Sequence, residues 1–410
     1  MLLQSKKQDQ NGIELSAKSV TNSYRALSLD ILRGLIMIVM ALDHVRDYFH
    51  ADAFVYDPGN LEKTNVVLFI TRWITHFCAP LFVLLSGTSA FLAGRSMSKG
   101  ELSRFLLKRG LLLIFIEILI INFAWSFNIH LPRITLGVLW AIGVSMIFLA
   151  GIIFLPGKII LLVGIVMIAT HNLLDAVHIA GNGPLALLWG VLHERKVFTF
   201  GETIVRSSYP LIPWIGVMAA GYMLGGLYDP KFDVRRRKRL LIYLGSASVI
   251  LFILLRVINL YGDPSPWTTQ TTATYTILSF FNTTKYPASL DFLLMTIGPG
   301  LLLLAVIEEW SSPFARVVTT YGKVPLFYYV VHLYAIHFLA MIAAVVSGYS
   351  WSAMILSTSI HDAAGLEGFG FSLLGVYIVW IALVVALYPL CRLYSNYKNA
   401  HKEKRWLKYL

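Results

Sequence analysis

Ionisable side chains line one edge of the otherwise apolar segment at residues 29–50, LDILRGLIMIVMALDHVRDYFH. Successive positions on this edge are three or four residues apart, which is the spacing of one face of an α-helix. The face consists of Asp30, Arg33, Met37, Met40, His44 and Asp47. A charged side chain near the centre of a bilayer costs about 2.5–3.5 kcal/mol by insertion scales, so such residues usually face a protein interior or a wet cavity. We therefore expect this edge to face inward.

Two residues of this edge have the chemistry that a group-transfer reaction needs. An imidazole acts as a nucleophile or a general base near neutral pH, and a guanidinium pairs well with phosphate. Arg33 and His44 are separated by about 16 Å along a helix that rises 1.5 Å per residue. Asp47 is three residues from both His44 and His50, close enough to pair with either. Asp30 and Asp47 would also fit ordinary interfacial positions at the two ends of the helix. That explanation fits Arg33 and His44 less well, because they lie further inside the helix.

Other polar groups occur inside the apolar segments that follow. Arg72 and His76 are four positions apart on one face of the second segment. Asp43, His44, His50 and His76 are therefore candidates to meet in one pocket, because clusters of titratable groups favour active sites. A lone histidine at such a position would more often be a packing residue.

Later segments contribute three more candidates. His332 lies near the middle of its apolar segment, and His337, five positions on, faces a different side, so the two do not form a ligand pair. Lys285 and Asp291 flank the proline-marked start of another helix. We find no H-E-x-x-H or C-x-x-C motif and therefore expect no metal. Dinucleotide and P-loop motifs are also absent from the sequence.

The elements that position these residues are expected to be membrane-spanning helices. The chain has 410 residues, of which 57% are hydrophobic and only 14% charged, with a mean hydropathy of +0.68. Soluble proteins carry about a quarter charged residues, and a span needs about 20 apolar residues. The sequence predicts an all-α polytopic bundle of ten spans, at 27–49, 66–93, 105–126, 134–155, 157–178, 209–228, 239–260, 288–307, 324–347 and 371–394. The fifth span and the irregular segment 179–208 are the least clear. Small residues in SGTSA, at 86–90, predict close helix packing.

Charge distribution predicts the orientation of the bundle. Lys and Arg concentrate on the side that holds both termini, which the positive-inside rule makes cytoplasmic. Asp30, Arg33 and Glu117 are the three charged residues that are assigned to neither side and are placed within helices. We expect a polar cytoplasmic tail at 1–26, one transmembrane domain at 27–395 and a basic cytoplasmic tail at 396–410. The net charge of +12 is explained by this topology and does not indicate nucleic-acid binding.

Five segments resemble the bacterial proteins grouped with the catalytic domain of heparan-α-glucosaminide N-acetyltransferase. They are RALSLDILRGLIMIVMALDH, THFCAPLFVLLSGTSAFLAGR, YPLIPWIGVMAAGYMLGG, KYPASLDFLLMTIGP and GKVPLFYYVVHLYAIH, and the resemblance runs from about residue 25 to 395. Arg33 and His44 are also similar to the Arg/Lys-x10-His signature of related acyltransferases that O-acetylate bacterial surface sugars. The resemblance implies a multi-pass protein of the bacterial inner membrane.

The resemblance further implies acetyl transfer from cytosolic acetyl-CoA to the amine or hydroxyl of an external saccharide. The candidates for the CoA phosphates are Arg33, Arg104, Lys108 and Arg109, although ordinary positive-inside charge explains the last three equally well. The lysosomal enzyme's active histidine lies just beyond its first helix, where His50 is the nearest match, whereas the sugar O-acetylating relatives indicate His44. We favour His44, with Asp43 or Asp47 beside it. Expected substrate contacts are His76, His332, Lys285 and Asp291.

Two other readings remain open. A small-solute or proton-coupled transporter would also keep polar groups inside the bundle, although no second copy of the Asp-x-x-Arg…Asp-His pattern indicates an internal repeat. A non-catalytic component of an envelope-assembly complex would not need buried histidines. The expected partners are the bilayer, acetyl-CoA and an external saccharide, with a homodimer left open.

Overall fold

The computed structural model describes residues 27–358, 363 and 365–409, so the predicted polar tail at 1–26 lies outside the described residues. After a helix at 27–49, the first half of the chain forms η1 (Ala51–Phe54), α2 (Val66–Thr75), α3 (Cys78–Gly94), α4 (Lys99–Phe115), the π-helix η2 (Ile116–Ile121), α5 (Asn122–Ser126), β1 (Arg133–Leu136), α6 (Val138–Ile152), α7 (Gly157–Thr170) and η3 (His171–Leu174). The second half forms α8 (Pro184–Leu192), β2 (Lys196–Phe200), β3 (Thr203–Ser207), α9 (Leu211–Leu224), η4 (Gly225–Tyr228), α10 (Val234–Ile258), α11 (Ala273–Phe281), α12 (Leu290–Ile307), α13 (Pro313–Lys323), α14 (Pro325–Val346), η5 (Trp351–Met354), α15 (Leu373–Ala400) and η7 (Arg405–Lys408).

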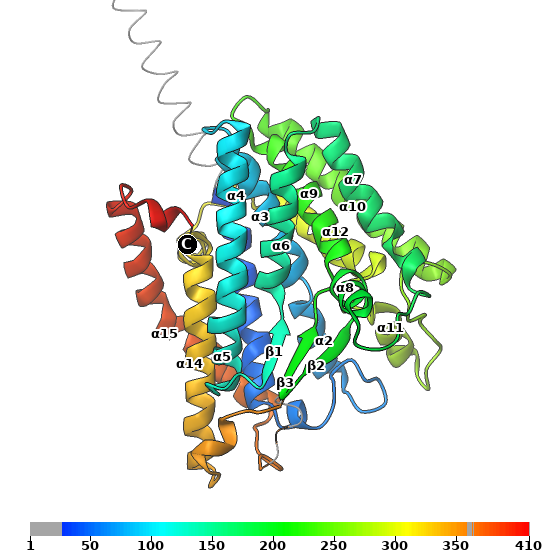
Figure 1. Ribbon diagram of the computed structural model, residues 1–410, viewed down its shortest axis with the longest axis vertical. Coiled ribbons are helices and arrows are strands. Elements are labelled where there is room, and N and C mark those ends of the chain that lie inside the picture. Colours follow the sequence, from blue (N-terminus) through cyan, green and yellow to red (C-terminus); the bar gives the residue numbers. More distant parts are fainter. Residues whose placement is uncertain (1–26, 359–362, 364, 410) are drawn as a thin grey trace, which may run out of the picture.

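The fold is a bundle of apolar helices, as predicted, with most long helices running along the long axis of the molecule (Figure 1). Seven described helical stretches have the length and composition to cross a bilayer: Val66–Gly94, Gly157–Leu174, Leu211–Tyr228, Val234–Ile258, Leu290–Ile307, Pro325–Val346 and Leu373–Ala400. The other three predicted spans, at 27–49, 105–126 and 134–155, are also mostly helical. The total of ten spans and the side on which the termini lie remain predictions.

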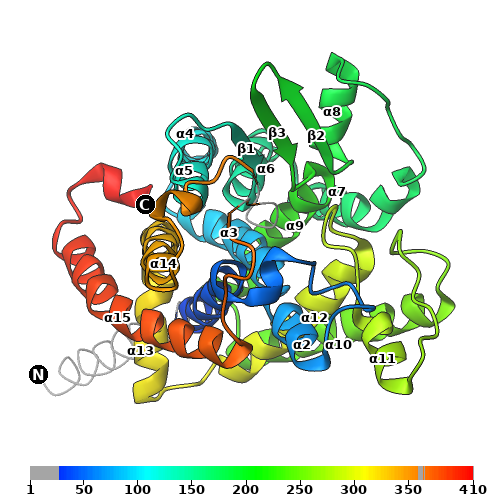
Figure 2. The ribbon, with the colours of Figure 1, turned by 90° about the horizontal axis from the view of Figure 1, so that it is seen from below.

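The helix at 27–49 lies inside the bundle, among α3, α12, α14 and α15 (Figure 2). Ile31, Leu32 and Val45 are fully buried on it. Its contact with α13 is between backbones, because a Cβ atom on Gly322 would lie 1.8 Å from the carbonyl oxygen of Asp30. Only glycine fits there. This close approach holds the helix at 27–49, and with it the ionisable edge, against α13.

The predicted close packing of the SGTSA segment is confirmed. A Cβ atom on Gly87 of α3 would lie 2.2 Å from the carbonyl oxygen of Met218 on α9, and one on Gly221 would lie 2.2 Å from the carbonyl oxygen of Leu84. The Thr88 hydroxyl donates to the Gly221 carbonyl at 3.0 Å. Small residues let the two backbones meet, which is how apolar helices associate tightly in lipid.

A small sheet stands at one end of the bundle, where the sequence pattern was least clear. Its strand order is β1-β3-β2, with β1 parallel to β3 and β2 antiparallel to β3. The segment 179–208 thus contains α8 and a hairpin that turns through Gly201, whose φ is +60°. The predicted fifth span ends at Leu174, four residues before its expected end.

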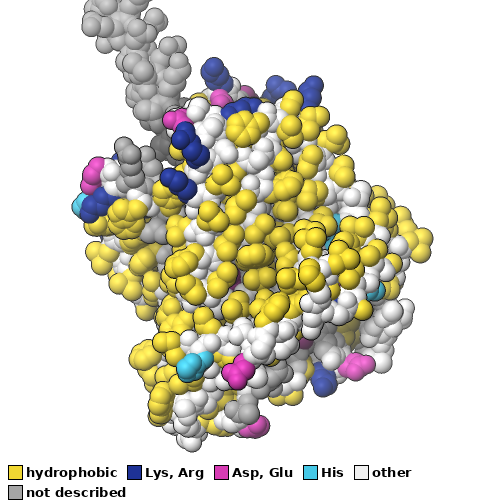
Figure 3. Space-filling view, viewed as in Figure 1, with side chains coloured by type: hydrophobic (Ala, Val, Ile, Leu, Met, Phe, Trp, Pro, Cys, Tyr) yellow, Lys and Arg dark blue, Asp and Glu magenta, His cyan; other side chains and the backbone are white. Residues whose placement is uncertain are grey.

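The two ends of the bundle differ in charge. Lys and Arg gather where α4 begins, and hydrophobic side chains cover the flanks below them (Figure 3). Lys99, Arg104 and Arg235 are exposed at this end, which we call the basic end. The opposite end carries the β-sheet and is called the sheet end. The helices α10 and α15 are only 22% and 17% buried within their apolar windows, as expected for surfaces that contact lipid.

Candidate active site

The ionisable edge of the helix at 27–49 faces two cavities. Arg33, Met37 and Met40 line a cavity of about 250 Å³ toward the basic end. Met40, His44 and Asp47 line a second cavity of about 550 Å³ toward the sheet end. The prediction that this edge faces inward is therefore confirmed.

The two cavities share one wall. Met40, Phe82, Val138 and Tyr329 line both of them. These side chains come from the helix at 27–49, α3, α6 and α14, so four helices converge on this layer. We call it the partition. A molecule that enters from the basic end and one that enters from the sheet end would meet here.

His44 is held by a second histidine rather than by a carboxylate. Its Nδ1 lies 2.7 Å from Nε2 of His332 on α14. Nδ1 of His332 lies 2.9 Å from the carbonyl oxygen of Tyr328, one helical turn earlier. His332 is fully buried, and Trp125 packs edge-on to His44 with 5.1 Å between ring centroids. His332 does not line either cavity, so it positions His44 and does not face the contents of the site.

His50 has a different environment. It follows the helix at 27–49, is 6% exposed, and its Nδ1 accepts a hydrogen bond from the backbone N–H of Asp52 at 3.2 Å. This contact caps η1. His50 is absent from the residues that line the two cavities. The structure thus places His44, and not His50, beside the space that a substrate would occupy.

The two candidate carboxylates bind arginines. Asp43 accepts hydrogen bonds from Arg72 at 3.0 and 3.1 Å and from Thr75 at 2.8 Å, and it lies 2.8 Å from Arg46. Asp47 also pairs with Arg46, at 2.6 Å. Both carboxylates line the sheet-end cavity. Their ion pairs tie the helix at 27–49 to α2 and form a charged wall beside His44.

The basic-end cavity contains four cationic side chains. Arg33 donates to Asp30 at 2.7 Å, to Ser89 at 2.9 Å and to the Gly322 carbonyl at 3.1 Å. Arg109 also lines this cavity, and its buried Nε has no hydrogen-bond partner among the described residues. The sequence analysis missed the other two, Lys323 and Lys398, because Lys323 directly precedes a predicted span and Lys398 follows one, so both resemble ordinary flanking charge.

Arg104 and Lys108 lie elsewhere. Both are exposed on α4, and neither lines the basic-end cavity. Arg104 donates to the Gly100 carbonyl of its own helix at 3.4 Å. Of the four residues predicted to contact CoA, the structure brings only Arg33 and Arg109 together.

The four predicted substrate contacts separate into different places. Lys285 lines the sheet-end cavity and also a smaller cavity of about 190 Å³, which His76 lines as well. His76 packs edge-on against Phe292 and its Nδ1 is unpaired in the described structure. Asp291 is 1% exposed, lies 3.8 Å from Arg256 and lines none of these cavities.

The sheet end adds residues that sequence reasoning did not assign. Glu117 lies on the π-helix η2, accepts a hydrogen bond from the backbone N–H of Leu139 at 2.9 Å and lines the sheet-end cavity. π-Helical turns of this kind are frequent at functional sites. Arg133, Arg195 and Arg206 reach the same cavity from the sheet and its hairpin. The only sequence signal that could have identified these four residues is a charged residue within an apolar run, and of the four only Glu117 has it.

Tyr56 is a neutral hydroxyl at the rim of the sheet-end cavity. Desolvation and a 2.7 Å hydrogen bond to Asp52 raise the pKa of Tyr56 to about 12. At neutral pH this side chain can therefore donate or accept a hydrogen bond but is not a base.

Comparison with known proteins assigns this chain to a family. No curated protein matches the chain. The family model described as heparan-alpha-glucosaminide N-acetyltransferase, catalytic, matches residues 25–257. The match covers the helix at 27–49, the two helices α3 and α9, and the sheet. The resembling segments at 285–299 and 322–337 lie C-terminal to the matched residues. Because the match spans more than half of the sequence, the chain belongs to the heparan-α-glucosaminide N-acetyltransferase catalytic family.

Proposed function

We propose that this membrane acetyltransferase moves an acetyl group from acetyl-CoA, bound at the basic end, to a saccharide bound at the sheet end. The observation that carries the proposal is the meeting of two cavities at the partition, with Arg33 in one and His44 in the other on the same helix face. The opposite locations of the two substrates match the predicted orientation, in which the basic end is cytoplasmic.

The cations of the basic-end cavity support the donor site. Guanidinium and ammonium groups pair with phosphate oxygens, and Arg33, Arg109, Lys323 and Lys398 all line this cavity. Its inner part is apolar, with Met37 and Leu139 in the lining. The nucleotide phosphates would remain near the cations while the pantetheine arm carries the thioester to the partition. Arg104 and Lys108, being outside the cavity, would meet only the outermost phosphates.

His44 is proposed as the reacting imidazole. In the general-base route, Nε2 of His44 takes the proton of the acceptor hydroxyl or amine while the acceptor atom attacks the thioester carbon. The C–S bond then breaks, and the CoA thiolate takes the proton from His44. In the covalent route, Nε2 attacks the thioester carbon first and CoA leaves as the thiolate. The acceptor atom then attacks the acetyl carbon, the bond between that carbon and Nε2 breaks, and the acceptor's proton passes to the thiolate.

The sheet-end cavity is suited to an acceptor that carries negative charge. Its lining includes six cations, Arg46, Arg72, Arg133, Arg195, Arg206 and Lys285, against four carboxylates, Asp43, Asp47, Asp57 and Glu117. A saccharide with carboxylate, sulfate or phosphate groups would match this excess. Of the residues expected to contact the acceptor, Lys285 lines the sheet-end cavity. His76 would contact the acceptor from the neighbouring smaller cavity.

The proposal is tested with purified protein in proteoliposomes. Labelled acetyl-CoA is supplied on one side, and amino-sugar oligosaccharides, neutral or uronate-containing, are supplied on the other. Label should move to the saccharide, with the charged acceptor preferred. Saccharide uptake that does not depend on acetyl-CoA would contradict the proposal and favour a transporter. The acetylated product can be identified by mass spectrometry.

A further inference from the structure

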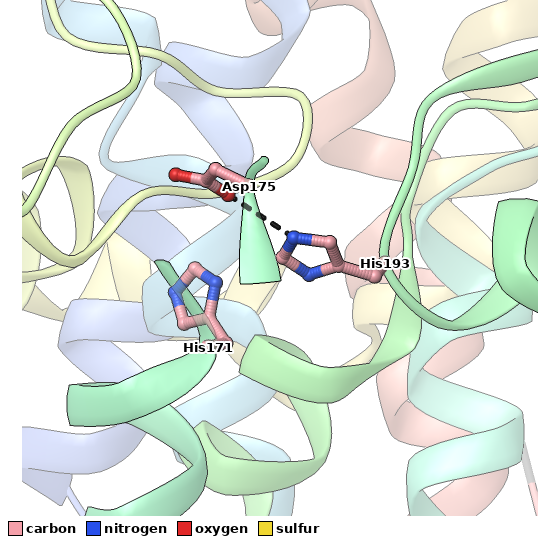
Figure 4. A group of neighbouring side chains, drawn as sticks. All are labelled: His171, Asp175 and His193. Carbon is pink, nitrogen blue, oxygen red and sulfur yellow. Dashed lines mark hydrogen bonds and ion pairs between the residues drawn. The ribbon is translucent and has the colours of Figure 1, made fainter. Parts of the chain in front are cut away.

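A second cluster of chemically competent residues lies between the end of α7 and the end of α8, away from the cavities described above. His171, Asp175 and His193 each offer one ligand atom, and these atoms all lie within 4.8 Å of one another. Figure 4 shows the three side chains converging from different segments of the chain. None of them lines the basic-end, sheet-end or smaller cavity. The cluster is therefore separate from the proposed acetyl-transfer site.

The imidazoles of this cluster are buried with unpaired nitrogens. His171 is 1% exposed, and neither of its ring nitrogens has a hydrogen-bond partner in the described structure. His193 is 3% exposed and its Nδ1 is likewise unpaired, while its Nε2 lies 3.1 Å from Oδ1 of Asp175. Leaving a buried polar atom without a partner costs about 1–3 kcal/mol. An ion bound between the two rings and the carboxylate would occupy one nitrogen of His171, which otherwise has no partner in the described structure.

The carboxylate is itself oriented by a further residue. The Asn172 amide nitrogen donates to Oδ2 of Asp175 at 2.7 Å, and the Asn172 oxygen accepts from the backbone N–H of Leu290 at 2.9 Å. Oδ1 of Asp175 is thereby directed at His193. Metal-binding side chains are commonly fixed by outer hydrogen bonds of this kind.

We propose that His171, Asp175 and His193 bind a divalent transition-metal ion, with Zn²⁺ the best match. Two imidazoles and one carboxylate are favourable Zn²⁺ ligands, and ligands about 2.0–2.1 Å from a tetrahedral ion stand about 3.3 Å apart. Nε2 of His193 and Oδ1 of Asp175 are 3.1 Å apart, which is close to this separation. Asp175, with a side chain 22% exposed, leaves an outer edge where water can supply the fourth ligand. Hard-ligand sites for Mg²⁺ or Ca²⁺ use oxygen atoms and not imidazole.

The bound ion would link the segment that leads into the β2–β3 hairpin, which forms part of the sheet-end cavity, to the segment that follows α7. His171 begins η3 directly after α7, Asp175 follows η3, and His193 follows α8, two residues before Arg195 and shortly before the β2–β3 hairpin. Arg195 and Arg206 of this region line the sheet-end cavity. The role is structural, because the ion would lie outside that cavity. The expectation of no metal rested on short motifs, which cannot detect ligands brought together across a fold.

The test uses the full-length protein stripped with a chelator and then titrated with Zn²⁺ or Co²⁺. Wild-type protein should bind one equivalent by elemental analysis, show visible Co²⁺ absorption bands and melt at a higher temperature with Zn²⁺ than without it. Asn172→Ala should weaken binding about 10- to 100-fold. His171→Ala and His193→Ala should lose the equivalent. His178→Ala is the matched control, because this nearby histidine has a side chain 72% exposed and should not change binding.

Two results would overturn the proposal. The first is wild-type protein that takes up no ion and whose melting temperature does not respond to Zn²⁺, a measurement that does not depend on any variant folding. The second is an equivalent of Zn²⁺ that persists in His171→Ala and His193→Ala alike, which would mean that the ion binds elsewhere. Neither result depends on the acetyl-transfer reaction, so the two proposals are tested separately.

Discussion

Nδ1 of His44 lies 2.7 Å from Nε2 of His332, and this contact determines which nitrogen of His44 is left without a proton. The Tyr328 carbonyl can only accept, so Nδ1 of His332 must carry the proton that it donates at 2.9 Å. In the neutral tautomer, Nε2 of His332 is then an acceptor, and Nδ1 of His44 must donate to it. Nε2 of His44 is left with a free lone pair. The pair of histidines thus presets the tautomer that a base or nucleophile requires.

We expect His332→Ala to lower kcat for acetyl transfer by about 10²-fold, the lower range for loss of efficient acid–base catalysis. KM for acetyl-CoA should change little, because His332 does not line the donor cavity. His332→Gln should recover part of kcat, since its amide oxygen can accept from His44. Steady-state kinetics of the three proteins test this relationship. If kcat is preserved and only KM or the stability of the protein changes, His332 contributes to packing and does not act through His44.

His44→Ala should reduce transfer by about 10²- to 10⁴-fold, the range for removal of a general base, while acetyl-CoA still binds. His50→Ala is the control, because that ring caps η1 and lines neither of the two cavities. Transfer and CoA binding are measured on both variants. Full activity in His44→Ala would refute the assigned role. Acetyl label trapped on His44 after quenching would establish the covalent route.

Arg33→Met should weaken acetyl-CoA binding by roughly 10- to 100-fold, because a hydrogen bond to a charged group contributes about 1.5–3 kcal/mol. Arg104→Met, which removes an exposed cation outside the cavity, should have little effect. Calorimetric titration with a non-hydrolysable acetyl-CoA analogue separates the two. Equal weakening in both variants would mean that general positive charge, and not the basic-end cavity, attracts the donor.

Gly322→Ala should destabilise the bundle, because its Cβ atom would lie 1.8 Å from the Asp30 carbonyl oxygen and force the helix at 27–49 away from α13. Overpacking of this kind typically costs about 1–3 kcal/mol. Gly100→Ala is the control, since a Cβ atom there meets nothing within 4 Å. Melting temperatures in detergent measure the difference. Equal stability of the two variants would show that the helix contact can relax.

Helical periodicity was enough to predict the inward-facing edge at Arg33, Met37, Met40, His44 and Asp47, because a face follows directly from spacing. The partner of His44 was not predictable in this way. His332 is 288 positions away, and only the packing of α14 against the first helix brings it within 2.7 Å. His332 was predicted to be a substrate contact, but it lines neither cavity, and its place against His44 follows only from that tertiary contact.

The β2–β3 hairpin was missed for a different reason. A search for apolar stretches of about 20 residues cannot detect two strands of five residues, although Lys196–Phe200 and Thr203–Ser207 are rich in β-branched and aromatic residues around Gly201. The same limit hid Arg195 and Arg206 as cavity residues. Asp43 and Asp47 do line the sheet-end cavity together with His44. Spacing did not predict that Arg46 on the same helix pairs with both carboxylates and that Arg72 on α2 pairs with Asp43.

The partition has a consequence for the membrane as a whole. Met40, Phe82, Val138 and Tyr329 are the only described residues that line both cavities, so the two spaces share no more than this one layer of side chains. An acyl fragment handed over this short barrier would leave ions and metabolites on their own sides. Chemical modification of the outer surface would then proceed without dissipating the electrochemical gradient that the cell maintains.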